Sequence, residues 1–194
     1  MSNNAFSPPK SAPNWADRFG SVEKSEAALG ESTPVANPSP PHQVLPRRIN
    51  LGSGKSWHPD FLNIDINPFW KPDMVLDFGK DLQDICQEVE SARFGRIRLQ
   101  PGSFELIAAH DVLEHVHELT QMMENCLELL ALGGMFDIVV PYDLSYGAWQ
   151  DPTHVRAFNE RSWLYYTDWF WYLGWTKARF ETVKLDFTLS ERGK

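Results

Sequence analysis

A short apolar run that ends in two glycines constrains the fold of this 194-residue chain more than any other feature. Ile49-Asn50-Leu51 leads directly into Gly52-Ser53-Gly54, which predicts a strand that opens into a tight turn. Glycine has no Cβ, so the backbone there can take dihedral angles that other residues avoid, and a ligand can approach the main chain closely. A plain glycine turn between two elements is the alternative.

An acidic residue closes the second predicted strand, residues 61–65. The carboxyl ends of neighbouring strands in an open parallel sheet face one crevice, so Asp65 can accept hydrogen bonds from ribose hydroxyls. A dinucleotide fits less well, because its fingerprint needs a third glycine where this chain has Trp57. Asp65 also follows Gly52 too closely for an ordinary crossover helix. The two features together predict a nucleoside site.

Strand and helix signals alternate along the rest of the folded part. Strands are predicted at 48–51, 61–65, 74–77, 104–109 and 135–140, with a further strand at 178–189. Apolar periodicity predicts a helix near 82–94 and a long helix over 111–132, which Gly133-Gly134 would end. This alternation predicts an α/β fold: a Rossmann-like, doubly wound, mainly parallel sheet of about six to seven strands with helices on both faces.

Four motifs, in this order, resemble the class I S-adenosylmethionine (SAM) dependent methyltransferases. They are Ile49–Gly54, Asn63–Ile66, Asp111–His115 and Leu132–Pro141, and the likeness runs from about residue 47 to about residue 165. The chain is most similar to a small branch with an Asn-Leu-Gly-x-Gly opening and a shortened first crossover. The resemblance implies that SAM is the cofactor and S-adenosyl-L-homocysteine (SAH) the product.

The resemblance also implies where the cofactor would bind. Asp77 stands at the position that meets adenine, where an acid can accept from the exocyclic amine while Phe78 stacks on the ring. A strand-end turn at Asp77 and a helix N-cap at Asp111 are the alternatives. The implied cofactor contacts are Asn50, Leu51, Gly52, Ser53, Gly54, Asp65, Ile66, Asp77, Phe78, His110 and Asp111.

The chemistry is expected just beyond the fifth strand. Methyl transfer from a sulfonium is an in-line displacement, so the enzyme supplies alignment, and a base when the acceptor is a hydroxyl. His154 is the predicted base, with Asp151 fixing its tautomer. A loop-pinning role for residues 151–154 carries equal weight. The predicted substrate contacts are Tyr142, Asp143 and Arg156.

Four neighbouring residues raise the question of a metal site. On one helix, His115 with Glu118, or Glu114 with His117, could share a face. No cysteine supports such a site, the resemblance already accounts for Leu-Glu-His here, and methyl transfer needs no Lewis acid. No metal is therefore expected.

An aromatic segment near the C-terminus offers three interpretations. Its side chains can pack in the core, form a wall for the substrate, or form a homodimer or partner-protein surface. The residues are Trp163, Tyr165, Tyr166, Trp169, Phe170, Trp171, Tyr172 and Trp175.

Charge, cysteine spacing and apolar segments limit which partners and which cellular compartment are expected. The net charge of −8 and the pI of about 5.2 argue against nucleic-acid and membrane binding, because phosphate contacts need clustered Lys and Arg. Cys86 and Cys126 have neither metal-ligand nor disulfide spacing and are expected as free thiols. No signal peptide or apolar run of membrane-spanning length is found, which favours the cytoplasm.

Residues 1–46 are expected to form a disordered, Pro- and Ser-rich leader before a methyltransferase-like domain at 47–194. Trp15 and Phe19, four residues apart, could instead form one face of a short docking helix. The function predicted overall is SAM-dependent methyl transfer to a small-molecule or sugar-containing (glycan) acceptor, at oxygen. The alternative is a noncatalytic module that binds a partner protein through the aromatic segment.

Overall fold

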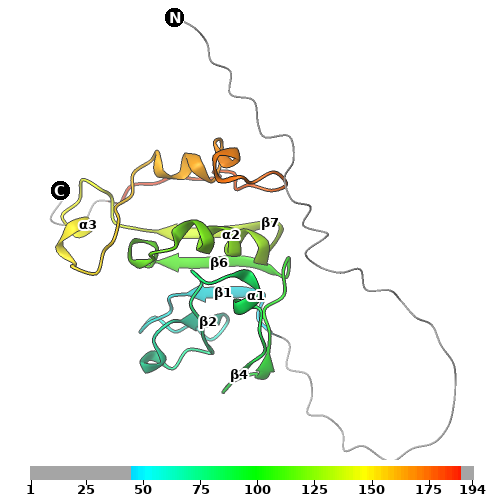
Figure 1. Cartoon of the computed structure of the whole chain (residues 1–194). Helices are drawn as coiled ribbons and strands as arrows, with labels where there is room; N and C mark the ends of the chain where they lie inside the picture. Colours follow the sequence, from blue (N-terminus) through cyan, green and yellow to red (C-terminus); the bar gives the residue numbers. More distant parts are fainter. Residues whose placement is uncertain (1–44, 189–194) are drawn as a thin grey trace, which may run out of the picture. The chain divides into compact units, whose positions relative to one another are not determined.

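The computed structural model describes residues 45–188 (Figure 1). The chain divides into two units, Met1–Gln43 and Val44–Lys194, and all described residues belong to the second. Trp15, Phe19 and nearly all of the predicted leader lie outside the described residues. The leader and its boundary at residue 46 therefore stay predictions.

A five-stranded parallel sheet forms the centre of the fold. Its strands are β1 (Arg48–Leu51), β2 (Leu62–Asp65), β3 (Met74–Val75), β6 (Phe104–His110) and β7 (Leu130–Val139). Their order is β3-β2-β1-β6-β7, and every neighbouring pair is parallel. The chain moves outward from β1 to β3 and then returns to the other side of β1. This confirms the predicted parallel, Rossmann-like sheet, with five strands in the described residues where six to seven were predicted.

The helices of the described part are short. They are α1 (Leu82–Ile85), α2 (Leu119–Leu129) and α3 (Gly147–Gln150), with 3-10 turns η2 (Pro68–Trp70), η3 (Leu113–His115), η4 (Ser162–Tyr165) and η5 (Phe170–Leu173). Among residues 45–188, no helix has both the length and the apolar character that crossing a membrane requires.

Helix α2 packs against the sheet through one apolar face. Its buried residues recur every three or four positions, as the sequence predicts, and include Leu119, Met122, Met123, Cys126 and Leu129. Asn125 lies on this buried face too, and its side chain donates to the carbonyls of Phe78 and Lys80 at 2.8 and 2.7 Å. That pair of bonds ties the loop after β3 to α2.

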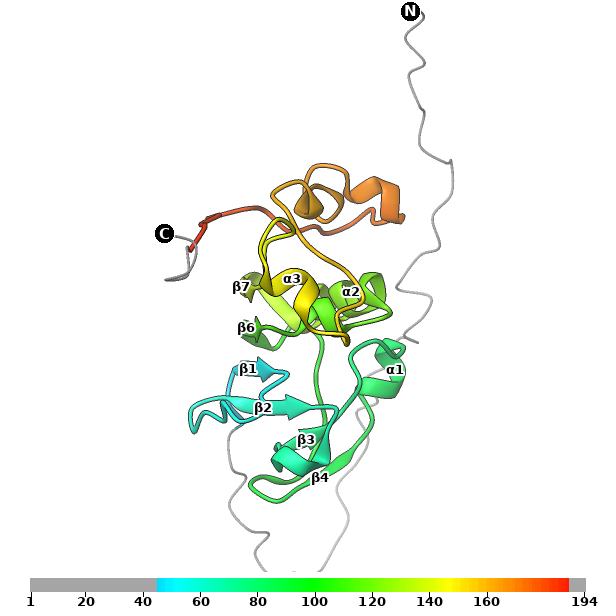
Figure 2. The same cartoon turned by 90° about the vertical axis from the view of Figure 1, so that its left-hand side faces the viewer.

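One face of the sheet is more open than the other. Helices α1 and α2 lie on the same side of the strands (Figure 2). On the opposite side of β7, Met135 and Val139 are 56% and 46% exposed. Parallel sheets are usually covered on both faces, and within the described residues the predicted second helical layer is not found over β7.

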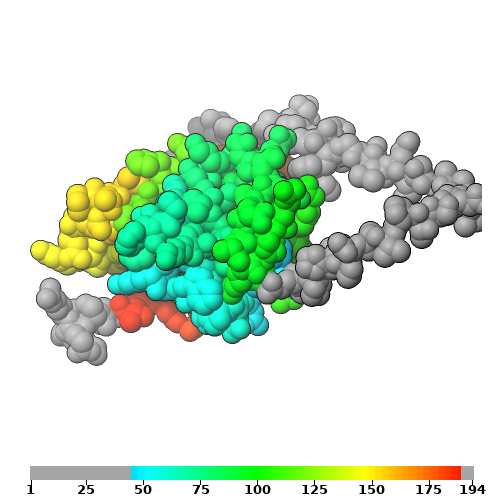
Figure 3. Space-filling model, turned by 90° about the horizontal axis from the view of Figure 1, so that it is seen from below, coloured from blue at the N-terminus to red at the C-terminus, as the bar shows by residue number. Residues whose placement is uncertain are grey.

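The predicted helix near 82–94 is largely wrong. Only α1 is helical there, and the chain continues as an antiparallel hairpin of β4 (Val89–Ser91) and β5 (Gly95–Ile97). Gly95 takes a left-handed φ of 68° at the turn, a conformation that glycine adopts without steric cost. The green part of the chain, which includes this hairpin, makes up much of the surface seen from below (Figure 3).

The long helix begins later and ends earlier than predicted. Asp111 has a left-handed φ of 55°, and Val116 is extended, so α2 starts only at Leu119. It ends at Leu129, and Gly133 and Gly134 lie inside β7 next to an irregularity in the β6–β7 register.

The predicted strand at 178–189 is also not formed in the described residues, which reach 188. Phe180 donates its backbone N–H to the carbonyl of Tyr166 at 3.0 Å rather than to a sheet partner. Its ring packs against Phe136 of β7 at 5.7 Å between centroids. The segment therefore lies against β7 through side chains and not through a strand ladder.

A buried polar network replaces the first crossover helix. Asn63 of β2 is fully buried, and its Oδ1 accepts from the His58 N–H at 2.8 Å. Its Nδ2 donates to the carbonyl of His58 at 2.8 Å and to Asp73 at 3.0 Å. Asp73 in turn forms an ion pair with Arg93 at 2.6 Å. Because a buried polar group without a partner costs about 1–3 kcal/mol, the network holds the loop between β1 and β2 in place.

Candidate functional site

The glycine turn lies where the strand order reverses. The carboxyl ends of β1 and β6 are neighbours, and ligands of open α/β sheets bind outside the strands at such a point. Gly52 and Gly54 have left-handed φ angles of 65° and 44°. A Cβ built on Gly52 would lie 2.3 Å from Cγ2 of Val112. The loops after β1 and β6 therefore meet at Gly52, and only glycine fits there.

Asp65 connects the turn after β1 to the turn after β2. Its Oδ2 accepts from the Gly54 N–H at 2.7 Å, and its Oδ1 accepts from the Asn67 N–H at 2.8 Å. The residue is 8% exposed. A carboxylate has about four lone-pair directions, so each oxygen can accept a further bond. The structure thus places an acceptor for hydroxyl groups beside the glycine turn.

The other predicted cofactor residues near this turn differ in whether their side chains are free to contact a ligand. Asn50 uses its Nδ2 within the protein, donating to the carbonyl of Ser56 at 2.9 Å and to Asn63 at 3.0 Å. Leu51 lies in the core, whereas Ile66, next to Asp65, is 65% exposed. Ser53 is buried, and its hydroxyl has no hydrogen-bond partner. Ile66, in the turn after β2, is therefore the exposed apolar side chain of this group.

Of the two residues predicted to contact adenine, Phe78 is buried and Asp77 forms a turn. Phe78 is 4% exposed and belongs to the core, so its ring is not open for stacking on a base. Asp77 accepts from the Gly79 N–H at 2.9 Å, which is the strand-end turn given as the alternative. Asp77 is only partly buried and keeps its second oxygen for a donor.

His110 ends β6 beside the glycine turn, and Asp111 follows it. His110 Nε2 lies 3.0 Å from Asp137 Oδ2 of β7, and both side chains are about half exposed. Asp111 donates its backbone N–H to the carbonyl of Val139 at 2.9 Å and has a positive φ. It is not a helix N-cap, because α2 begins at Leu119. A left-handed aspartate costs about 1 kcal/mol or more, and such strain often marks a functional position.

His154 is held differently from the prediction. Its Nδ1 lies 3.0 Å from the carbonyl oxygen of Ala148, which can only accept. Nδ1 therefore carries a proton, and Nε2 is the nitrogen that has the free lone pair in the neutral imidazole. Asp151 accepts instead from the N–H and the hydroxyl of Thr153 at 2.8 and 2.6 Å, and these bonds lower the pKa of Asp151. Asp151 thus pins the loop, and Ala148 sets the tautomer of His154.

Glu114 is a buried acid that the sequence analysis did not place with His154. Its side chain is 1% exposed, and Oε1 lies 4.0 Å from Nε2 of His154. Burial raises the pKa of the Glu114 carboxyl above its usual value. The ring of His115 meets the ring of His154 at 4.7 Å between centroids. No sequence spacing indicates this group, because His154 reaches it from a loop about 40 residues further along the chain.

Two hydrogen bonds to backbone carbonyls dock the loop of His154 onto η3 and the residues that follow it. Val155 donates its N–H to the carbonyl of Glu114 at 2.8 Å, and Arg156 Nη2 donates to the carbonyl of His117 at 2.8 Å. Arg156 was predicted to contact the substrate, but in the structure its Nη2 is used in a hydrogen bond within the protein. The loop and η3 therefore form one unit at the carboxyl edge of the sheet.

The other predicted substrate residues also have partners within the protein. The Tyr142 hydroxyl donates to Glu160 at 3.1 Å, and this bond raises the pKa of Tyr142. Asp143 Oδ2 accepts from Asn159 at 2.8 Å. Both residues follow β7, at the same edge as the glycine turn, but these atoms stabilise the loop rather than extend into open space.

The aromatic segment is divided between the core and the surface. Tyr166 and Trp175 are buried, and Trp163 stacks on Phe158 at 5.3 Å and an interplanar angle of 5°. Trp171 and Tyr172 are 48% and 69% exposed. The core-packing interpretation holds for the first group, and the exposed group keeps the surface interpretation open.

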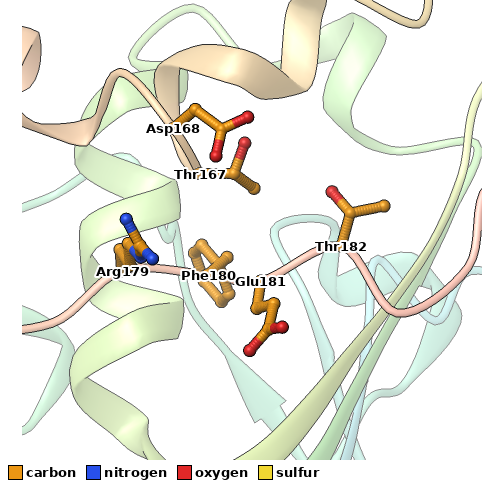
Figure 4. Close-up of a pocket in the computed structure, with 6 residues that line it drawn as sticks. All are labelled: Thr167, Asp168, Arg179, Phe180, Glu181 and Thr182. Carbon is orange, nitrogen blue, oxygen red and sulfur yellow. The ribbon is translucent and has the colours of Figure 1, made fainter.

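Two surface hollows lie away from the predicted cofactor residues. The first, of about 310 Å³, has one wall at Thr167 and Asp168 and the other on the segment Arg179–Thr182 (Figure 4). The second, of about 260 Å³, is lined by Ser145, Tyr146, Trp149 and Gln150. Neither includes a residue of the glycine turn, so the site is defined by topology and hydrogen-bonding groups and not by these hollows.

The thiols are unpaired, as expected. Cys86 and Cys126 are both free, and burial raises the pKa of each thiol. Neither belongs to the candidate site.

Comparisons with known proteins give little further information. No protein-family model matches the chain, and no curated protein matches it. One similar solved structure is described as the trans-methyltransferase CalH in complex with SAH, with 17% identity and a TM-score of 0.35. The match covers 48% of this chain and only 31% of that chain. The fold assignment therefore rests on the observed strand order and not on this likeness.

The contact between Gly52 and Val112 gives a stability prediction. Gly52→Ala should destabilise the protein more than Gly102→Ala, by at least about 1 kcal/mol, because both positions have φ near 65–70° but only Gly52 faces a neighbour. The measurement is urea unfolding followed by circular dichroism. Equal losses in the two variants would show that the loops after β1 and β6 do not meet as described.

Proposed function

We propose that this protein is a SAM-dependent methyltransferase that acts on a hydroxyl of a small-molecule or sugar-containing acceptor. One observation carries the proposal: a carboxylate, Asp65, is hydrogen-bonded to the glycine turn at the point where the strand order reverses. A nucleoside needs a close backbone approach and an acceptor for its ribose hydroxyls. The motif order described for the sequence favours SAM over other nucleosides.

The residues of the edge have distinct roles in this proposal. Gly52 and Gly54 let the cofactor approach the main chain, and Asp65 accepts from the ribose hydroxyls. His110 and Asp111 lie beside the turn, where the methionine part would bind. SAM itself supplies the electrophilic methyl group, so the protein has to align the acceptor oxygen and remove its proton. His154 Nε2 has the free lone pair that can accept that proton.

A noncatalytic, partner-binding module is the second candidate. The exposed Trp171 and Tyr172 favour it, because large aromatic side chains are enriched at protein interfaces. The engagement of Asn50 by Ser56 and Asn63 favours it too, since the amide is not free to meet a cofactor. A homodimer through the same surface, and a cytoplasmic location, also stay proposals.

Cofactor binding is the first test. Calorimetric titration of the full chain with SAM and with SAH should show micromolar binding that Asp65→Asn weakens at least about tenfold, since one acceptor oxygen is lost. Asp60→Ala is the matched control, because Asp60 is exposed in the neighbouring loop. Absence of binding by the unmodified protein would favour the noncatalytic module.

Turnover tests the role of His154. His154→Ala should lower SAH release at least about 100-fold, the usual size of a general-base contribution, and leave SAM affinity unchanged. His117→Ala is the control, since its backbone bond to Arg156 survives the substitution. SAH release is measured with the best acceptor from a panel of hydroxylated small molecules and sugars. Full turnover by His154→Ala would remove the residue from the mechanism.

A further inference from the structure

We propose that Glu114, His115 and His154 form a binding site for a divalent transition-metal ion. Each contributes one donor atom, and these atoms lie within 4.8 Å of one another. Two come from η3 and one from the loop that docks onto it. Two imidazoles and one carboxylate are a common donor set for Zn²⁺ and Fe²⁺.

The carboxylate gives an independent reason to expect a cation. The Glu114 side chain is 1% exposed, and neither of its oxygens has a hydrogen-bond partner. Buried polar atoms without partners are rare, and each calls for an explanation such as a bound ion or water. An ion placed between Glu114 and His154 would satisfy a carboxylate that is otherwise costly to bury.

The hydrogen bonds around the two imidazoles leave a lone pair on each. For His154, Nδ1 donates to the carbonyl of Ala148, so Nε2 is the nitrogen with the lone pair in the neutral imidazole, and it lies 4.0 Å from Glu114 Oε1. For His115, Nδ1 lies 3.0 Å from the hydroxyl of Thr153, which itself donates to Asp151. The Thr153 oxygen therefore accepts from His115 Nδ1, and Nε2 is the nitrogen with the lone pair in the neutral His115 imidazole.

The hydrogen bonds that His154 and His115 form through Nδ1 are of the kind that metal-binding histidines use. A histidine ligand usually donates its second ring N–H to a carbonyl, a carboxylate or a polar group that leads to one, which fixes the ring and its tautomer. Ala148 does this for His154, and the Thr153–Asp151 pair does it for His115. This arrangement gives Asp151 a positioning role, through Thr153, in the metal site.

Only a small closure would be needed to bind an ion. Donors on one tetrahedral Zn²⁺, at about 2.1 Å from the metal, lie about 3.4 Å apart. The three groups would therefore move inward by roughly 1 Å, which a short 3-10 turn and a loop can accommodate. Along the sequence, only Glu114, His115, His117 and Glu118 are close enough to share one helix face. The structure instead brings Glu114 and His115 together with His154.

The site also bears on the proposed methyl transfer. Glu114 is three residues from Asp111, so the ion would lie close to the proposed cofactor edge. With an ion bound, His154 Nε2 would be a ligand, and acidifying the acceptor hydroxyl would pass from the imidazole to the ion. This consequence rests on the proposed function, whereas metal binding does not.

Metal titration tests the proposal directly. Tag-free full-length protein, freed of metal with a chelator, should bind one equivalent of Zn²⁺ by calorimetry and show visible absorption bands with Co²⁺. Glu114→Gln and His154→Ala should each weaken Zn²⁺ binding at least about tenfold, because each removes one ligand. His115→Ala should do the same, and His117→Ala should bind like the unmodified protein.

The contrary results are equally clear. No Zn²⁺ binding by the unmodified protein, or binding that Glu114→Gln and His115→Ala leave unchanged, would overturn the site. Circular dichroism of each variant shows whether it is folded, and His115→Ala changes the least buried of the three ligands. SAM titration of the metal-free protein is a separate experiment, so the metal site and the methyltransferase proposal can fail independently.

Discussion

The carboxylate of Asp65 is the interaction on which the arrangement of the site depends. It accepts one backbone N–H from the turn after β1 and one from the turn after β2. Because hydrogen bonds to an ionised acceptor are about twice as strong as neutral ones, this side chain holds two otherwise independent loops together. Val112, which follows β6, packs against Gly52. The loops after β1, β2 and β6 therefore meet at one edge of the sheet.

A second unit is assembled on the same edge. The segment 151–156 donates hydrogen bonds to the carbonyls of Glu114, in η3, and of His117. Thr153 also contacts His115, and His154 lies beside Glu114. The acidic and imidazole groups therefore come from segments that the sequence separates by about 40 residues. The buried side chains of Glu114 and His154 link the loop to the proposed cofactor edge.

Local patterns predicted the elements whose structure is decided locally. Strands β1 and β2 follow from short apolar runs ended by glycine or aspartate, and the apolar spacing of α2 follows from its buried face. The hairpin β4–β5 was missed because Leu82, Ile85 and Val89 have helical spacing, while the ion pair between Arg93 and Asp73 depends on tertiary contacts. The true start of α2 was missed because the left-handed φ of Asp111 has no sequence signature.

The site residues also divide into those that local sequence predicts and those that tertiary contacts decide. Gly52, Gly54 and Asp65 could be proposed from spacing alone, since strand ends in a parallel sheet meet at one edge. The partners of His154 could not, because they depend on how the loop folds back. Phe78 was misplaced for a related reason: an aromatic residue after a strand can turn outward or into the core, and only packing against α2 decides.

Nitrogen–proton NMR spectra of the isotope-labelled protein, recorded during a titration with SAM, test the central claim most directly. We expect the Gly54 and Asn67 amide signals to shift together and saturate together, because both N–H groups donate to Asp65 where the ribose would bind. Signals of Gly95 and Gly102, which lie in distant turns, should stay in place. Saturating SAM that leaves Gly54 and Asn67 unmoved would contradict a nucleoside site at this edge.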